Sequence, residues 1–105
     1  MTVLLKNGKL IDYKTKTDDY FDIFIENGTI KEIARDINAL ADQVIDCTNL
    51  FIIPGMIDIH CHLREPGFEY KETIETGMKS AVKGGFTSIC PMPNTNPIHL
   101  KHVAL

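Results

Sequence analysis

Two histidines set two residues apart are the clearest chemical feature of this sequence. His60 and His62 end the run Asp58-Ile59-His60-Cys61-His62, which follows apolar residues and is predicted to be a β-strand. Because side chains alternate faces along a strand, the two imidazoles point the same way and can meet one cation. Neutral imidazole suits zinc and similar metals. Two histidines do not complete such a site, so further ligands are needed. The alternative is a pair of surface histidines beside a turn.

Two more polar residues follow the ends of predicted strands. Arg64 comes two residues after His62, so an extended backbone aims it toward the same cavity. A guanidinium group there could hold a carboxylate through two hydrogen bonds. Asn94 lies in the Pro-rich segment after the next strand and carries a donor and an acceptor that could complete the carboxylate site. The alternatives are a surface Arg64 paired with Glu65 or Glu69, and a loop in which Asn94 serves a turn or a helix N-cap.

Asp58 lies two residues before His60 and shares its face if the strand is regular. It could orient an imidazole from behind, as carboxylates do for metal-bound histidines. Satisfying backbone amides near the strand is the open alternative. His99 and His102 are interpreted as surface residues.

A strand, a helix and a second strand are expected to position these side chains. Residues 56–60 and 86–90 are rich in β-formers, and residues 71–83 carry an apolar stripe at helical spacing that ends at Gly84-Gly85. Such a βαβ unit implies a parallel sheet. Parallel strands put their C-terminal ends at one edge, so the histidines and Asn94 are expected at the same edge.

The first half of the chain is predicted to form short antiparallel strands. Turns are expected at Asn7-Gly8 and Asn27-Gly28, because tight hairpin turns need positive φ at both central residues. The strand candidates are residues 3–5, 23–25, 29–33, 44–45 and 51–53. The character of the sequence changes near Pro54-Gly55, which predicts a first domain of residues 1–54 and a second of residues 55–105.

Composition argues against several classes of protein. The 105 residues carry 11 Lys or Arg and 14 Asp or Glu, with no Trp and no basic stripe, so no nucleic-acid partner is expected. No apolar run approaches the ~20 residues that cross a bilayer, and no signal peptide is visible, so the cytoplasm is the expected location and no membrane partner is predicted. Three cysteines without a paired spacing are predicted to be reduced.

Several motifs in order resemble a known family. Residues 54–62, PGMIDIHCH, resemble the first-strand signature of the amidohydrolase superfamily, PG-x-[IV]-D-x-H-x-H. The segments LREPG at 63–67, KETIETG at 71–77, GGFT at 84–87 and PMPNTNP at 91–97 are similar to bacterial dihydroorotases. The resemblance implies an α/β fold: the start of a TIM-type (β/α)8 barrel at residues 55–105, preceded by part of a small β-sandwich at residues 1–54. The chain is then expected to be truncated.

The resemblance also implies a reaction. A dihydroorotase of de novo pyrimidine biosynthesis would use one or two zinc ions to interconvert N-carbamoyl-L-aspartate and (S)-dihydroorotate. His60 and His62 would bind zinc, and Arg64 and Asn94 would hold the substrate carboxylate. Asp58 would orient one of the imidazoles without binding the metal itself. The other ligands and the general base are expected beyond the chain, so no catalytic residue is assigned within it and the 105 residues alone are expected to be inactive. The full-length form is expected to be a homodimer, and an association with aspartate carbamoyltransferase is considered.

Two alternatives stay open at this point. A related cyclic amidase, such as a hydantoinase, dihydropyrimidinase or allantoinase, would share the paired histidines, and the combination of Arg64 with Asn94 argues against it. A non-catalytic dihydroorotase-like partner of a transcarbamoylase would usually have lost metal ligands. The intact His60 and His62 argue against that alternative.

Overall fold

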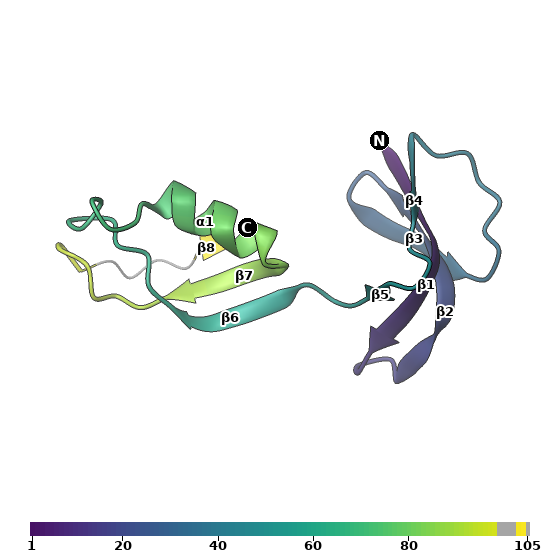
Figure 1. Cartoon of the computed structure of the whole chain (residues 1–105), viewed down its shortest axis with the longest axis horizontal. Coiled ribbons are helices and arrows are strands. Elements are labelled where there is room, and N and C mark those ends of the chain that lie inside the picture. The colour runs from purple at the N-terminus through teal and green to yellow at the C-terminus, as the bar shows by residue number, and fades with distance from the viewer. Residues whose placement is uncertain (99–102, 105) are drawn as a thin grey trace. The chain divides into compact units, whose positions relative to one another are not determined.

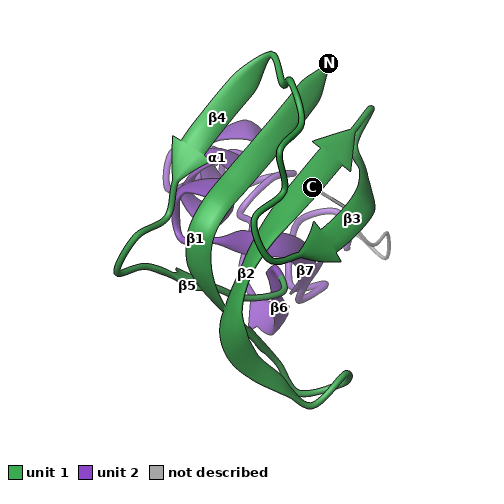
Figure 2. Ribbon diagram, turned by 90° about the vertical axis from the view of Figure 1, so that its right-hand side faces the viewer, with its two compact units in different colours: residues 1–54 green, residues 55–105 purple. Residues whose placement is uncertain are grey.

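The chain divides into two compact units, Met1–Pro54 and Gly55–Leu105, which Figure 2 colours green and purple. A computed structural model describes residues 1–98 and 103–104. Each unit is built on one sheet. The strands of the first follow the order β3-β2-β1-β4, with β5 also paired to β1, and those of the second follow the order β6-β7-β8. Among the described residues, no helix is long and apolar enough to cross a membrane.

The first unit is organised around its longest strand. The bounds of its strands are β1 (Thr2–Asp12), β2 (Thr17–Glu26), β3 (Thr29–Ala34), β4 (Gln43–Asp46) and β5 (Phe51–Ile52). The pairs β1–β2 and β2–β3 are antiparallel, as expected, and Asn27-Gly28 forms the predicted turn with φ of 50° and 75°. The antiparallel prediction is wrong for β4 and β5, which run parallel to β1. After β3 the chain crosses to the edge of β1 that β2 does not occupy. There β4 runs in the same direction as β1.

The expected turn at Asn7-Gly8 is wrong, because β1 continues through it. Between Leu5 and Gly8 the strand advances three residues while β2 advances two, which is a β-bulge. Asn7 has a φ of 62°. Asparagine tolerates this left-handed conformation in a bulge as well as in a turn. The asparagine therefore indicated a positive φ correctly, but the positive φ belongs to a bulge and not to the expected turn.

A buried carboxylate ties this bulge to the rest of the first unit. Asp22 on β2 is 3 % exposed and accepts hydrogen bonds from Lys6 Nζ at 2.6 Å, from the Asn7 amide at 2.8 Å and from the Ile37 amide at 2.9 Å. Burial alone would raise the pKa of Asp22, but Lys6 and the two amides outweigh it and hold this pKa below its ordinary value. The carboxylate therefore links β1, β2 and the segment after β3. The buried apolar side chains of the first unit are Leu4, Leu10, Ile23, Ile37 and Cys47.

The second unit contains the predicted βαβ arrangement. Its elements are β6 (Met56–Cys61), α1 (Ile74–Lys83), β7 (Phe86–Pro91) and β8 (Val103–Ala104). Strands β6 and β7 are parallel, which confirms the expected pairing, and α1 lies along them (Figure 1). A short strand that was not predicted, β8, pairs antiparallel with β7. His99 and His102 lie outside the described residues. With one sheet in each unit, the β-sandwich and the barrel stay predictions.

The helix begins three residues later than the predicted range of 71–83. Thr73 is the N-cap: its side chain accepts from the Thr76 amide at 3.1 Å, and the Thr76 hydroxyl accepts from the Thr73 amide at 3.1 Å. This reciprocal capping box satisfies two amides that would otherwise lack partners and fixes the start of α1 at Ile74. The end is as predicted, with Gly84 as C-cap and Gly85 at a φ of 87°.

Candidate active site

The two histidines lie side by side at the C-terminal end of β6. His60 is within the strand and His62 follows it, and their ring centroids are 5.4 Å apart with the ring planes at 64°. Both side chains are exposed. The two rings are therefore neighbours, whereas their binding of one cation stays a prediction. Among residues 1–98, however, no three His, Cys, Asp or Glu side chains are arranged to hold a metal ion. The histidines are therefore at most part of a site.

Asn94 contacts one of these histidines. Its Oδ1 lies 3.0 Å from His62 Nδ1, which joins the loop after β7 to the loop after β6. Both loops had been expected at one edge of the sheet, and this hydrogen bond shows the two residues in contact there. The spacing along the sequence gave no signal for the bond itself, because the partners are 32 residues apart.

Backbone contacts hold the two loops together. The Met92 amide donates to the Cys61 carbonyl at 2.8 Å, and the Asn96 amide donates to the Pro66 carbonyl at 3.0 Å. Gly67 approaches so closely that a Cβ atom there would stand 2.2 Å from the Asn96 carbonyl oxygen, and its φ of 97° also favours glycine. The segment with Arg64 and the segment with Asn94 are thus packed against each other.

Arg64 is half-buried and has no ion pair or side-chain hydrogen bond among the described residues. The alternative pairing with a neighbouring carboxylate is not found, since both candidates are engaged elsewhere. Glu65 Oε2 accepts from the Ile74 amide at 2.9 Å, at the start of α1. Glu69 Oε1 accepts from the Gly67 amide at 2.9 Å, and this hydrogen bond lowers the pKa of Glu69. The Glu65 contact has no signal in the sequence, because Glu65 lies nine residues before Ile74.

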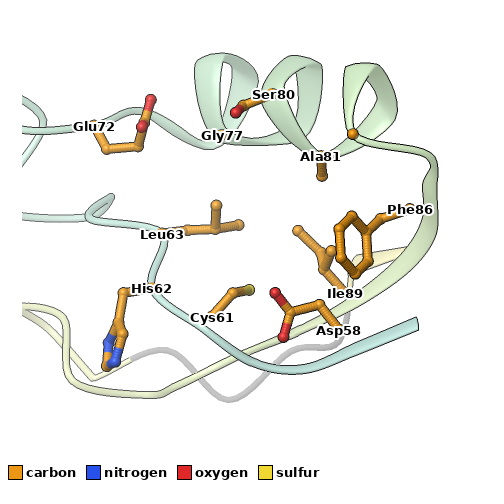
Figure 3. A pocket seen from close by; sticks show the side chains of 11 residues that line it. Asp58, Cys61, His62, Leu63, Glu72, Gly77, Ser80, Ala81, Phe86 and Ile89 are labelled. Carbon is orange, nitrogen blue, oxygen red and sulfur yellow. The ribbon is translucent and has the colours of Figure 1, made fainter. Parts of the chain in front are cut away.

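Asp58 contacts a backbone amide and no imidazole among the described residues. Its Oδ1 accepts from the amide of His60 at 3.0 Å, which is the alternative left open from the sequence. The shared face with His60 was inferred from strict alternation, but β6 advances three residues from Asp58 to Cys61 while β7 advances two. This irregularity lets Asp58 and Cys61 line the same pocket, and Figure 3 shows His62 pointing away from Asp58.

That pocket, about 410 Å³ in volume, lies between α1 and the strands. His62 and Glu72 stand at one end of it and Phe86 at the other (Figure 3). Leu63, Ala81 and Ile89 give it an apolar wall, and neither Arg64 nor Asn94 lines it. It is therefore a space between helix and sheet, and the predicted carboxylate site does not lie in it.

Cys61 lies between the two histidines in sequence and lines the pocket between α1 and the strands. Burial raises the pKa of its thiol, and the nearby Asp58 and Cys90 add to the effect.

Comparison with known proteins gives a consistent result. Residues 49–103 match the family described as dihydro-orotase-like. Over 98 residues the chain is 52 % identical to the dihydroorotase of Ruminiclostridium cellulolyticum, a match that covers 93 % of this chain and 23 % of the relative. Over 97 residues it is 53 % identical to the dihydroorotase of Elusimicrobium minutum, covering 92 % and 22 %. The chain thus spans about a quarter of the length of these curated relatives.

Solved structures of cyclic amidases share the fold. The L-hydantoinase (dihydropyrimidinase) of Arthrobacter aurescens superposes with a TM-score of 0.81 at 30 % identity, covering 91 % of this chain and 21 % of that one. The D-hydantoinase (dihydropyrimidinase) of Thermus sp. superposes with a TM-score of 0.73 at 36 % identity, covering 87 % and 20 %.

Proposed function

Because the chain belongs to the dihydro-orotase-like family, we propose that the full-length protein containing it is a dihydroorotase. Full-length here means this chain together with the segments that the longer relatives possess. The reaction is the reversible closure of N-carbamoyl-L-aspartate to (S)-dihydroorotate, a step of pyrimidine biosynthesis. The observation that carries the proposal is the pair of imidazoles at the end of β6, with ring centroids 5.4 Å apart and with Asn94 in contact with His62.

The donor set at this strand end fits zinc in part. Two exposed imidazoles are suitable ligands, and His60 and His62 would hold one ion of a site with one or two zinc ions. When bound, such an ion polarises an amide carbonyl and lowers the pKa of a bound water molecule. The described residues provide no third ligand, so the proposal assigns the remaining ligands and the general base to other parts of the full-length protein.

Arg64 and Asn94 are proposed to recognise the substrate carboxylate. The Arg64 guanidinium is half-buried and has no acidic partner among the described residues, so its charge is available to a ligand. A fork of N–H groups matches the two oxygens of a carboxylate. Asn94 contributes an amide N–H from the loop that packs against the Arg64 segment. Together they would hold the substrate with its amide near the histidines.

Asp58 is proposed to support the site through the backbone. By accepting from the His60 amide it fixes the strand at the residue that carries the first imidazole. Location in the cytoplasm, a homodimeric full-length form and an association with aspartate carbamoyltransferase belong to the same proposal, as does the absence of a nucleic-acid or membrane partner.

A hydantoinase-like cyclic amidase is the second candidate, because hydantoinases superpose on this chain with TM-scores of 0.73 and 0.81. The two candidates differ in substrate. Dihydroorotate carries a carboxylate that Arg64 can bind, whereas hydantoin itself carries none. Activity on dihydroorotate that exceeds activity on hydantoin and depends on Arg64 separates them.

The test uses the full-length protein and four variants. His60→Ala and His62→Ala should each lose zinc and ring-closing activity. Arg64→Ala should keep its zinc and raise KM for N-carbamoyl-L-aspartate about tenfold or more, as expected for the loss of a charged hydrogen bond. Arg64→Lys keeps the charge without the forked guanidinium group, so its KM should lie between the values of the wild type and of Arg64→Ala. Unchanged zinc content in both histidine variants, or hydrolysis of hydantoin in preference to dihydroorotate, would contradict the proposal.

A further inference from the structure

We propose that Asn94 uses the two ends of its carboxamide for two tasks. Its oxygen fixes the tautomer and orientation of His62, and its nitrogen, oriented as a consequence, faces the substrate carboxylate. This inference rests on the proposed function and deepens it. Asn94 becomes a positioning residue for the metal ligand in addition to a substrate contact.

The hydrogen bond between Asn94 Oδ1 and His62 Nδ1, 3.0 Å long, has one possible direction. A carboxamide oxygen carries no hydrogen and can only accept, so Nδ1 of the imidazole must carry the proton. In a neutral ring the other nitrogen, Nε2, then keeps its lone pair. The contact therefore selects Nε2 as the atom of His62 that can bind a metal, before any metal arrives.

Asn94 can do this because its loop is held on both sides. Met92 is bonded through its amide to the Cys61 carbonyl, and Asn96 through its amide to the Pro66 carbonyl. Between Asn94 and Asn96, Thr95 is 8 % exposed and donates through its hydroxyl to the Pro97 carbonyl at 2.8 Å. A side chain on such a fixed loop loses little conformational entropy when it accepts from an imidazole.

The same bond decides which end of the carboxamide is available to a ligand. With Oδ1 turned to His62, the amino group of Asn94 has no hydrogen-bond partner among residues 1–98, and the side chain is exposed. An amino group only donates, so it suits an anionic oxygen. His60 differs from His62, because no side chain among the described residues accepts from its ring.

Two substitutions separate the two tasks in the full-length protein. Asn94→Asp keeps an acceptor for His62 and replaces the donor with a negative charge. Asn94→Ala removes both. Asn96→Ala is the matched control, because it lies on the same loop and keeps the amide that donates to Pro66. Nitrogen NMR of the metal-free protein, with labelled histidine, reports the tautomer of His62. Competition with a zinc-chelating dye reports affinity, and steady-state kinetics report KM.

The wild type and Asn94→Asp should show His62 protonated at Nδ1 and should bind zinc equally well or, for the aspartate, more tightly. Asn94→Ala should lose that preference and bind zinc about tenfold or more weakly, the usual effect of losing a group that orients a ligand. Both Asn94 variants should raise KM for N-carbamoyl-L-aspartate, and Asn94→Asp should raise it more because two carboxylates repel. Asn96→Ala should leave the His62 tautomer, the zinc affinity and KM unchanged.

A metal-free wild type with His62 protonated at Nε2 would overturn the inference even if a variant failed to fold. So would an Asn94→Ala protein with unchanged tautomer and zinc affinity, or an Asn94→Asp protein with unchanged KM. The proposed function fails separately: a wild type that binds zinc and shows the expected tautomer but does not cyclise N-carbamoyl-L-aspartate refutes the dihydroorotase activity and leaves the role of Asn94 toward His62 in place.

Discussion

Gly77 on α1 lies against Leu63: a Cβ atom at Gly77 would stand 2.4 Å from Leu63 Cδ2. Leu63 is 6 % exposed and directly follows His62, so this contact lies one residue from the histidine pair. A glycine inside a helix costs about 1 kcal/mol relative to alanine. The close approach of Leu63 gives a physical reason for its presence.

Replacement of Gly77 by alanine should therefore stabilise the protein by less than helix propensity alone predicts. The gain from propensity is about 1 kcal/mol, and the movement that the end of the Leu63 side chain must make toward the adjoining pocket offsets part of it. Urea denaturation of the full-length protein measures the balance. Gly84→Ala is the control, because Gly84 is in the right-handed region and a Cβ there would meet no atom closer than 3.4 Å. Adding Leu63→Ala to Gly77→Ala should recover part of the overpacking cost, and strict additivity would show that the two residues do not clash.

The contribution of Asp22 to stability should disappear in acid. Its folded-state pKa is lowered, so protonation favours the unfolded chain: the contribution is complete above the unfolded value of about 4 and is lost as pH falls through the lower folded value. Asp22→Asn should flatten the fall in unfolding free energy as the pH is lowered below about 4. Asp22→Ala should cost about 3 kcal/mol at neutral pH, because Lys6 and two amides lose their acceptor.

An exposed aspartate serves as the comparison for that titration. Asp42 also has a lowered pKa, caused by hydrogen bonds from Thr2, but its side chain is 65 % exposed. Asp42→Asn should change the acid limb much less than Asp22→Asn. Equal effects of the two substitutions would show that burial of Asp22 is not what makes it important.

Residues 1–105 by themselves should show no dihydroorotase activity at any zinc concentration. Two imidazoles leave a zinc ion short of its usual four ligands, and the described residues hold no third. The assay is ring closure of N-carbamoyl-L-aspartate with added zinc, with the full-length protein as positive control. Turnover by the 105 residues that is lost in His60→Ala would show that they carry a sufficient site, and would refute the assignment of the missing groups to other segments.

Local patterns predicted the second unit well. The change from strand to helical spacing and back gave β6, α1 and β7, because those periods are set within one element. The predicted range of 71–83 begins three residues before α1, although Thr73 and Thr76 at a spacing of three form the cap. In the first unit, the parallel pairing of β4 and β5 depends on where the chain crosses the sheet. Short apolar runs in the sequence do not indicate where that crossing occurs.

The candidate site, too, was predictable from the sequence only in part. The proximity of His60 and His62 follows from alternation over two residues. The bond between His62 and Asn94 depends on how two loops pack, and the orientation of Asp58 depends on an irregularity in β6, so neither could be read from spacing.

The packing of the two loops also restricts how this protein can evolve. Because the Asn96 amide is bonded to the Pro66 carbonyl and Gly67 leaves no room beside the Asn96 backbone, neither loop can gain or lose a residue independently. An insertion after β6 would push Asn94 away from His62, and one after β7 would do the same from the other side. Changes of loop length at this edge should therefore occur in pairs.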